Sequence, residues 1–216
     1  MSGRAVAGAL LGALAVYTVA LFIGELATSQ QAVRVFFTDV RIPGSKMWFG
    51  LNTTLCVALM WGSAGSFAAA WRANRMWDRA PERARFFVSQ VLVFLYLGAD
   101  DRFTFHETIG GALHHRLAWF DDSFILLGLG VLELALLVGL MPRALATRTA
   151  LRWLAAGAVC YAISTAVDGL VPRDLPGRLA LEDLSKTWSV TCLLAWAWTV
   201  LGIELEELRR SPPAPS

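Results

Sequence analysis

Residues 5–24 read AVAGALLGALAVYTVALFIG, a run of twenty positions without a charged side chain. A helix rises about 1.5 Å per residue, so a run of this length can cross a bilayer hydrocarbon core of about 30 Å. The run is longer than the apolar region of about 7–15 residues in a cleaved signal peptide, so we expect a retained helix. This stretch predicts a membrane protein built from α-helices.

The composition of the whole chain points the same way. Of the 216 residues, 56% are hydrophobic and 17% are charged, whereas a soluble domain carries about 25% charged residues. The mean hydropathy is +0.53. A net charge of +2 is too small to indicate a nucleic-acid partner, so we expect none. Three cysteines are too few for a disulfide scaffold, and the apolar excess excludes a disordered chain.

Five further apolar stretches follow the first one. We therefore predict an all-α fold, a polytopic bundle of six transmembrane helices that forms a single domain over residues 1–210. The expected spans are about 5–26, 47–71, 86–112, 123–141, 150–170 and 185–205. The last six residues, SPPAPS at 211–216, should form a flexible cytoplasmic tail, because their prolines cannot extend a helix.

The basic residues indicate which way the bundle crosses the membrane. Eleven of the nineteen fall in segments on the same side as the N-terminus, and five of these (Arg72, Arg75, Arg79, Arg83 and Arg85) occupy one loop. Cytoplasmic loops are enriched in Lys and Arg, so both termini should be cytoplasmic. We expect an integral protein of a bacterial inner membrane, with lipids and other membrane proteins as its candidate partners.

The acidic residues gather on the opposite, outer side, together with all three histidines. Eleven of the seventeen acids are there: Glu25, Asp39, Asp100, Asp101, Glu107, Asp121, Asp122, Asp168, Asp174, Glu182 and Asp183. Asp100 follows Phe86 by only about 21 Å of helix, and Asp168 follows Trp153 by about 22 Å. Both distances fall short of a core about 30 Å thick, so these carboxylates should lie below the outer surface and face the bundle interior. The sequence predicts a shared polar pocket.

The segment DDRFTFHETIGGALHH at 100–115 carries the predicted site chemistry. If it stays helical, Asp100 and Glu107 share one stripe and His106 points along the adjacent face. Carboxylate and imidazole ligands suit zinc, iron or manganese. Our hypothesis is a divalent metal ion bound by Asp100, His106, Glu107, Asp168 and Glu182. The alternatives are structural pairing of Asp100 or Asp101 with Arg102 or Lys186, and a proton or ion path.

A second polar motif, LEDLSKTW at 181–188, opens the last span. Glu182 and Lys186 have the i, i+4 spacing of a surface ion pair. In the functional interpretation, Asp183 and Lys186 handle protons as catalytic residues. Glu133 stands alone within the fourth span, where it serves either as a neutral packing acid or in a proton relay.

These motifs carry a family resemblance over about thirty residues. The pattern D-D-x4-H-E at 100–107, followed by E-D-x-x-K at 182–186, resembles a group of uncharacterised bacterial polytopic membrane proteins with D-E-x4-H-E and a later pair of acids. That resemblance implies no particular activity. The second motif is also similar to the E-E-x-x-K of intramembrane metalloproteases of the prenyl-protein protease type. Those proteins carry histidines after the acidic motif, and this chain has none after His115.

We therefore expect a membrane protein with a carboxylate and histidine pocket on the outer side. The favoured activity is a metal-dependent enzyme, a hydrolase for example, that acts on a lipid or another amphiphile. The alternatives are a non-catalytic subunit of a larger membrane complex and a proton- or ion-coupled transporter.

Overall fold

The computed structural model describes residues 3–37, 50–76, 81–117, 119, 123–172 and 174–210. Within these residues the chain forms eight α-helices, one short 3-10 helix and no strand, which confirms the all-α prediction. The elements are α1 (Gly3–Ala27), α2 (Gln30–Phe37), α3 (Leu51–Met76), α4 (Pro81–Phe103), α5 (Phe105–His114), α6 (Ser123–Leu140), η1 (Arg143–Leu145), α7 (Arg148–Leu170) and α8 (Arg178–Arg210). The expected tail at 211–216 and the start of the second expected span, at 47–49, lie outside the described residues.

Four of the described helices are long and apolar enough to cross a membrane: α1, α3, α7 and α8. The expected number was six. The third expected span is divided between α4 and α5, and α4 carries charged side chains near both of its ends. The fourth, α6, is apolar but shorter than those four helices. The structure therefore supports a membrane protein with several apolar helices and does not by itself give six spans.

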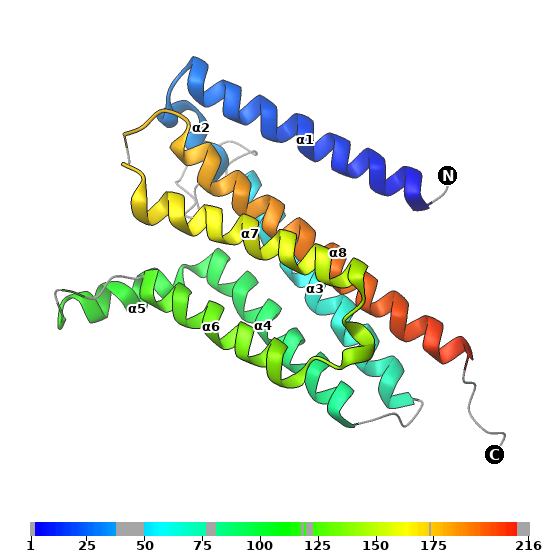
Figure 1. Cartoon of the computed structure of the whole chain (residues 1–216). Helices are drawn as coiled ribbons and strands as arrows, with labels where there is room; N and C mark the ends of the chain where they lie inside the picture. Colours follow the sequence, from blue (N-terminus) through cyan, green and yellow to red (C-terminus); the bar gives the residue numbers. More distant parts are fainter. Residues whose placement is uncertain are drawn as a thin grey trace.

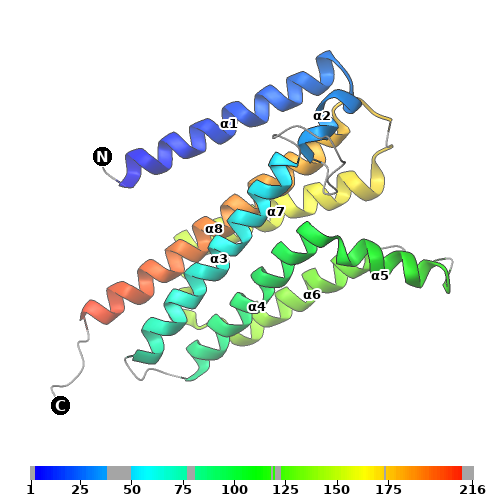
Figure 2. The ribbon, with the colours of Figure 1, turned by 180° about the vertical axis from the view of Figure 1, so that it is seen from behind.

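The helices run up and down between two ends of an elongated bundle (Figure 1). Helix α1 begins and α8 ends at the same end of the molecule, where α3 also ends and α4 begins. At the opposite end lie α2, α5 and the start of α8. The view from behind shows α3 and α8 crossing the bundle side by side, with α1 set apart from α4 and α6 (Figure 2). This alternation brings the predicted cytoplasmic and outer segments to opposite ends.

The core of the bundle is built by α3, α4, α7 and α8. Four aromatic side chains fill its centre: Phe67 from α3, Phe86 and Phe94 from α4, and Trp196 from α8. The Phe67 ring centroid lies 5.1 Å from that of Trp196 and 5.9 Å from that of Phe94. Edge-to-face and stacked contacts at these separations are favourable for aromatic rings, so the cluster holds three helices together.

The outer end differs from the expected arrangement in two ways. Helix α2 occupies part of the segment expected to be a loop, and it packs Val33 and Phe37 against the start of α8. The polar segment after Asp100 does not continue as one helix, because Thr104 adopts the left-handed conformation with φ 51° and ψ 45°. The chain changes direction there, and α5 leaves the axis of α4. The expected stripe that joins Asp100 to Glu107 is therefore wrong.

Candidate functional site

The break at Thr104 brings His106 back onto the last turn of α4. One carboxylate oxygen of Asp100, Oδ1, accepts a hydrogen bond from the His106 backbone N–H at 2.8 Å, and Oδ2 lies 2.7 Å from His106 Nδ1. Asp100 is buried, and the His106 side chain is 17% exposed. The hydrogen bond to Asp100 raises the pKa of His106 above its usual 6.5, although burial acts in the opposite direction. Asp100 thus fixes the orientation of the imidazole, and its Nε2 has no hydrogen-bond partner within the described residues.

The neighbouring acid, Asp101, points to a different partner. Its carboxylate oxygen Oδ1 forms an ion pair with Lys186 of α8, and only 4% of the Asp101 side chain is exposed. The other oxygen, Oδ2, is buried and has no hydrogen-bond partner among the residues that the structure describes. Thr187 follows Lys186 directly on α8, and its hydroxyl lies 2.9 Å from Asn52 Oδ1 and 3.3 Å from the Cys56 sulfur. A layer of polar groups thus crosses from α4 through α8 to α3.

Two other predicted ligands converge on an arginine instead. Arg178 Nη2 lies 2.8 Å from Asp168 Oδ1, and Arg178 Nη1 lies 2.7 Å from Glu182 Oε2. The same guanidinium donates to the backbone carbonyl oxygens of Val171 and Asp168. Arg178 is 8% exposed and joins the end of α7 to the start of α8. The spacing of Arg178 to Glu182 is i, i+4, so the sequence contained this alternative to the expected pairing of Glu182 with Lys186.

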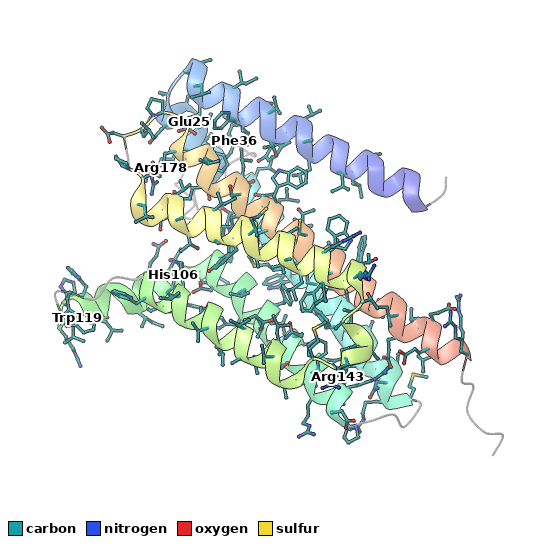
Figure 3. All side chains as sticks on the ribbon, viewed as in Figure 1. Glu25, Phe36, His106, Trp119, Arg143 and Arg178 are labelled. Carbon is teal, nitrogen blue, oxygen red and sulfur yellow. The ribbon has the colours of Figure 1, made fainter. Side chains whose placement is uncertain are left out.

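Glu25 is another acidic residue at the outer end of the bundle, and the sequence analysis did not predict its role. Its two carboxylate oxygens accept hydrogen bonds from the backbone N–H groups of Gly177, at 3.0 Å, and Ala180, at 2.6 Å. Glu25 is 2% exposed, and it satisfies N–H groups that the start of a helix otherwise leaves unpaired. The negative charge also suits the positive end of the α8 dipole. Figure 3 shows Glu25 and Arg178 close together, with His106 at the same end and Arg143 at the opposite one.

The structure places the seven predicted site residues in more than one group. Asp100 lies with His106, Lys186 lies with Asp101, and Asp168 and Glu182 share Arg178. Glu107 lies on the exposed side of α5, and Asp183 is half-buried on α8. Within the described ranges, no three His, Cys, Asp or Glu side chains form a group that could hold a metal ion. The shared metal ion stays a prediction.

A cavity of about 780 Å³ lies between α4, α6 and α7. Half of its lining residues are leucines, and one of these, Leu193, comes from α8. Tyr96 and Tyr161 also line it, as does Glu133, the lone acid of α6. Transport through Glu133 stays a prediction, and the acid lies on the wall of this half-open cavity.

At the arginine-rich end, Arg83 pairs with two acids of α8. Arg83 Nη1 lies 2.8 Å from Glu204 Oε2 and 2.6 Å from Glu207 Oε2. Glu204 is fully buried, and its other oxygen lies 3.4 Å from Asn74 Nδ2. This network joins α3, α4 and α8, and the sequence carried no spacing signal for it because its members lie more than 120 residues apart.

Comparison with known proteins identifies the family of the chain. Residues 5–201 match the family model described as domain of unknown function DUF8692. No curated protein and no solved structure matches the chain. The match covers all of α3 to α7 and most of α1 and α8. This chain therefore belongs to the DUF8692 family.

Proposed function

We propose that this protein is an integral membrane enzyme in which His106 transfers a proton to or from a lipid or another amphiphile. The observation that carries the proposal is the double hydrogen bond of Asp100 to the backbone and the ring of His106. A carboxylate that holds Nδ1 of a histidine leaves Nε2 to act on a substrate as a general acid or base. The ordinary pKa of histidine lies close to physiological pH, and the hydrogen bond to Asp100 raises the pKa of His106.

The membrane domain in this proposal has six spans, with α4 and α6 beside the four long apolar helices. Residues 86–99 of α4 carry no charge, and α6 contains one acid, Glu133, in an otherwise apolar helix. Helix α4 packs against α3, and α6 packs against α4 (Figure 1). The arginine-rich end faces the cytoplasm, by the positive-inside rule, and His106 lies at the outer end.

A divalent metal ion (zinc, iron or manganese) would be bound by only some of the predicted ligands, because others already have partners within the chain. Asp100 already accepts two hydrogen bonds from His106, and Asp168 and Glu182 are paired with Arg178. A histidine that ligates a metal ion commonly donates its other ring N–H to a carboxylate, as His106 does to Asp100. His106 Nε2 is thus the candidate ligand. Elemental analysis of the purified wild type and of His106→Ala tests whether His106 binds a metal ion. Equal trace amounts of metal in the two proteins would reject the metal site.

A measurement of lipid turnover tests the proposed enzymatic activity. The purified protein is incorporated into nanodiscs with a total bacterial lipid extract, and products are measured by mass spectrometry. We expect the wild type to form a product and His106→Asn to lose about 10²-fold or more of that rate. The matched control is His115→Asn, which changes an exposed histidine at the end of α5. Equal product from wild type and His106→Asn, or no turnover by the wild type, would contradict the proposal.

A second candidate function, a non-catalytic subunit of a membrane complex, is favoured by the ion pairs themselves. Asp101–Lys186, Asp168–Arg178 and Arg83–Glu204 each connect two different helices. Charges used in this way stabilise helix packing and need no substrate. Stoichiometric co-purification with another membrane protein, without lipid turnover, would support this function.

A further inference from the structure

The loop that joins α6 to α7 carries three arginines within ten residues. Arg143 lies in η1, Arg148 is the first residue of α7, and Arg152 follows about one turn later on the same helix. All three residues are exposed. Figure 3 shows Arg143 at the end of the molecule opposite to His106. These three arginines together form what we call the arginine corner.

The positive charge of the arginine corner is not neutralised by the chain. The sequence between Glu133 and Asp168 contains no acidic residue. Within the described ranges none of the three arginines forms an ion pair, whereas Arg83, at the same end, pairs with two acids of α8. Like charges at the i, i+4 spacing destabilise a helix, and a cation is unfavourable at a helix N-terminus. A bound anion would relieve both effects.

The backbone of this loop is held in place on both sides of Ala146. Leu145 of η1 is fully buried in the core of the bundle, and η1 packs against α8. The Thr147 hydroxyl caps α7 by accepting a hydrogen bond from the Ala150 backbone N–H at 3.3 Å. The three arginines therefore extend from a packed turn, and their backbone positions do not require a ligand.

The position of the arginine corner relative to the membrane indicates which anion it meets. Residues 134–140 of α6 are apolar, and α7 is long and apolar enough to cross a membrane. Arg143 and Arg148 thus lie at the ends of two apolar helices, and Arg152 lies about 6 Å further along α7, from where a long side chain reaches the interface. The positive-inside rule assigns this end to the cytoplasm, where the leaflet contains anionic lipids. The anions at this level are lipid phosphates.

We propose that the arginine corner binds the phosphate group of an anionic phospholipid in the cytoplasmic leaflet. A guanidinium group can donate two parallel hydrogen bonds to phosphate oxygens, and three of them surround the phosphate with donors. Phosphatidylglycerol carries a net negative charge that complements the corner, whereas the choline group of phosphatidylcholine cancels the charge of its phosphate. This site does not depend on His106, which lies at the opposite end of the bundle.

Lipid binding is measured by native mass spectrometry of delipidated full-length protein in detergent. The protein is titrated with phosphatidylglycerol and with phosphatidylcholine of identical acyl chains, and we expect the first to bind at least about tenfold more tightly. Each of the single variants Arg143→Gln, Arg148→Gln and Arg152→Gln should weaken phosphatidylglycerol binding about fivefold. The triple variant should bind the two lipids equally. If the triple variant does not fold, the three single variants decide the same question.

A matched control removes the same charge from the same end of the bundle. Arg72, Arg75 and Arg209 are exposed and form no ion pair in the part of the chain that the structure describes. Their triple replacement by Gln should leave the preference for phosphatidylglycerol intact. Equal weakening by the two triple variants would show a diffuse attraction to the whole end of the protein, and would overturn the proposal.

Two further measurements separate this site from a soluble-phosphate site and from the proposed enzyme. Glycerol phosphate at the concentration of the lipid should not displace phosphatidylglycerol, because the soluble molecule has no acyl chains to lie against α6 and α7. Displacement by glycerol phosphate, or equal binding of the two lipids to the wild type, would contradict the proposal. His106→Asn should retain phosphatidylglycerol binding, so a loss of lipid turnover in that variant and a loss of lipid binding at the arginine corner test different proposals.

Discussion

Lys186 of α8 and Asp101 of α4 form an ion pair inside the bundle, with 31% of the lysine side chain and 4% of the aspartate side chain exposed. The two residues are 85 positions apart in the sequence, and their pairing connects two helices of the core. One carboxylate oxygen carries the bond, while the other is buried without a partner in the described structure. Removing either member of such a pair destabilises the protein, because it leaves an uncompensated charge inside the bundle.

Removing one member of this pair should cost more stability than removing both. Lys186→Met leaves the Asp101 carboxylate buried and uncompensated, which costs about 3–5 kcal/mol for a fully buried pair and less here because the lysine is partly exposed. Asp101→Leu combined with Lys186→Met should recover most of the loss. The free energy of unfolding in a detergent titration checks both. An additive double variant would show that the pair does not couple α4 to α8.

Glu25 should contribute to stability as a cap of α8 supplied by another helix. Glu25→Ala leaves the N–H groups of Gly177 and Ala180 without their acceptors, at a cost of about 1–3 kcal/mol. Glu25→Gln retains one acceptor oxygen and should lose less. Glu206→Gln is the control, because Glu206 belongs to an exposed ion pair with Arg210. If Glu25→Ala and Glu206→Gln lower the thermal midpoint equally, the cap is not a stabilising contact.

The stability contributed by His106 should depend on pH in one direction. Its pKa in the folded protein is raised above the usual 6.5, chiefly by the hydrogen bond to Asp100, so the protonated ring stabilises the fold. This contribution is fully present below about pH 6.5 and is lost as the pH rises through the raised pKa. Thermal unfolding of the wild type and His106→Gln from about pH 5.5 to about pH 9 measures it. The difference between them should be largest at the acidic end, and a difference that grows with pH would refute the pairing.

Hydropathy predicts where the helices of this protein lie in the sequence but not how their charged residues pair. The apolar runs predicted α1, α3, α6 and α7 closely, because length and composition decide whether a segment can be a buried helix. The partners of the charged residues depended on helix rotation and crossing, which hydropathy does not contain. Lys186 pairs with Asp101 across the bundle, which was one of the alternative pairings expected from the sequence, whereas Glu182 pairs with Arg178.

Two of the seven predicted site residues, Asp100 and His106, lie together in the structure, but the geometry of their contact was not expected. His106 and Asp100 were both expected, because a histidine next to acids at the end of an apolar run is unusual in a membrane helix. Their contact arises from a backbone break at Thr104, a β-branched residue with no intrinsic tendency toward the left-handed conformation. Arg178 and Glu25 were missed as organising residues, since their partners are set by the tertiary fold.

Thr104 should be a strained position whose relief stabilises the protein. A non-glycine residue in the left-handed conformation costs about 1–2 kcal/mol, and Thr104 has φ 51°. Thr104→Gly should therefore raise the free energy of unfolding by about 1 kcal/mol, less any loss from the greater freedom of glycine in the unfolded chain. Thr104→Ala retains the conformational cost and serves as the comparison. Equal stability of the two variants would mean that the conformation carries no strain.

Gly157 should be needed where α7 crosses α8. A Cβ added to it would lie 2.9 Å from Leu193 Cγ and 3.3 Å from the carbonyl oxygen of Ser189, and the Ser189 hydroxyl already donates to the Gly157 carbonyl at 2.8 Å. Gly157→Ala therefore forces the helices apart and should cost about 1–3 kcal/mol. Gly169→Ala, on the same helix with open space around it, should be neutral or stabilise slightly. Because both variants add the same methyl group to α7, a loss confined to Gly157→Ala isolates the close approach to α8, and equal effects on the thermal midpoint would reject it.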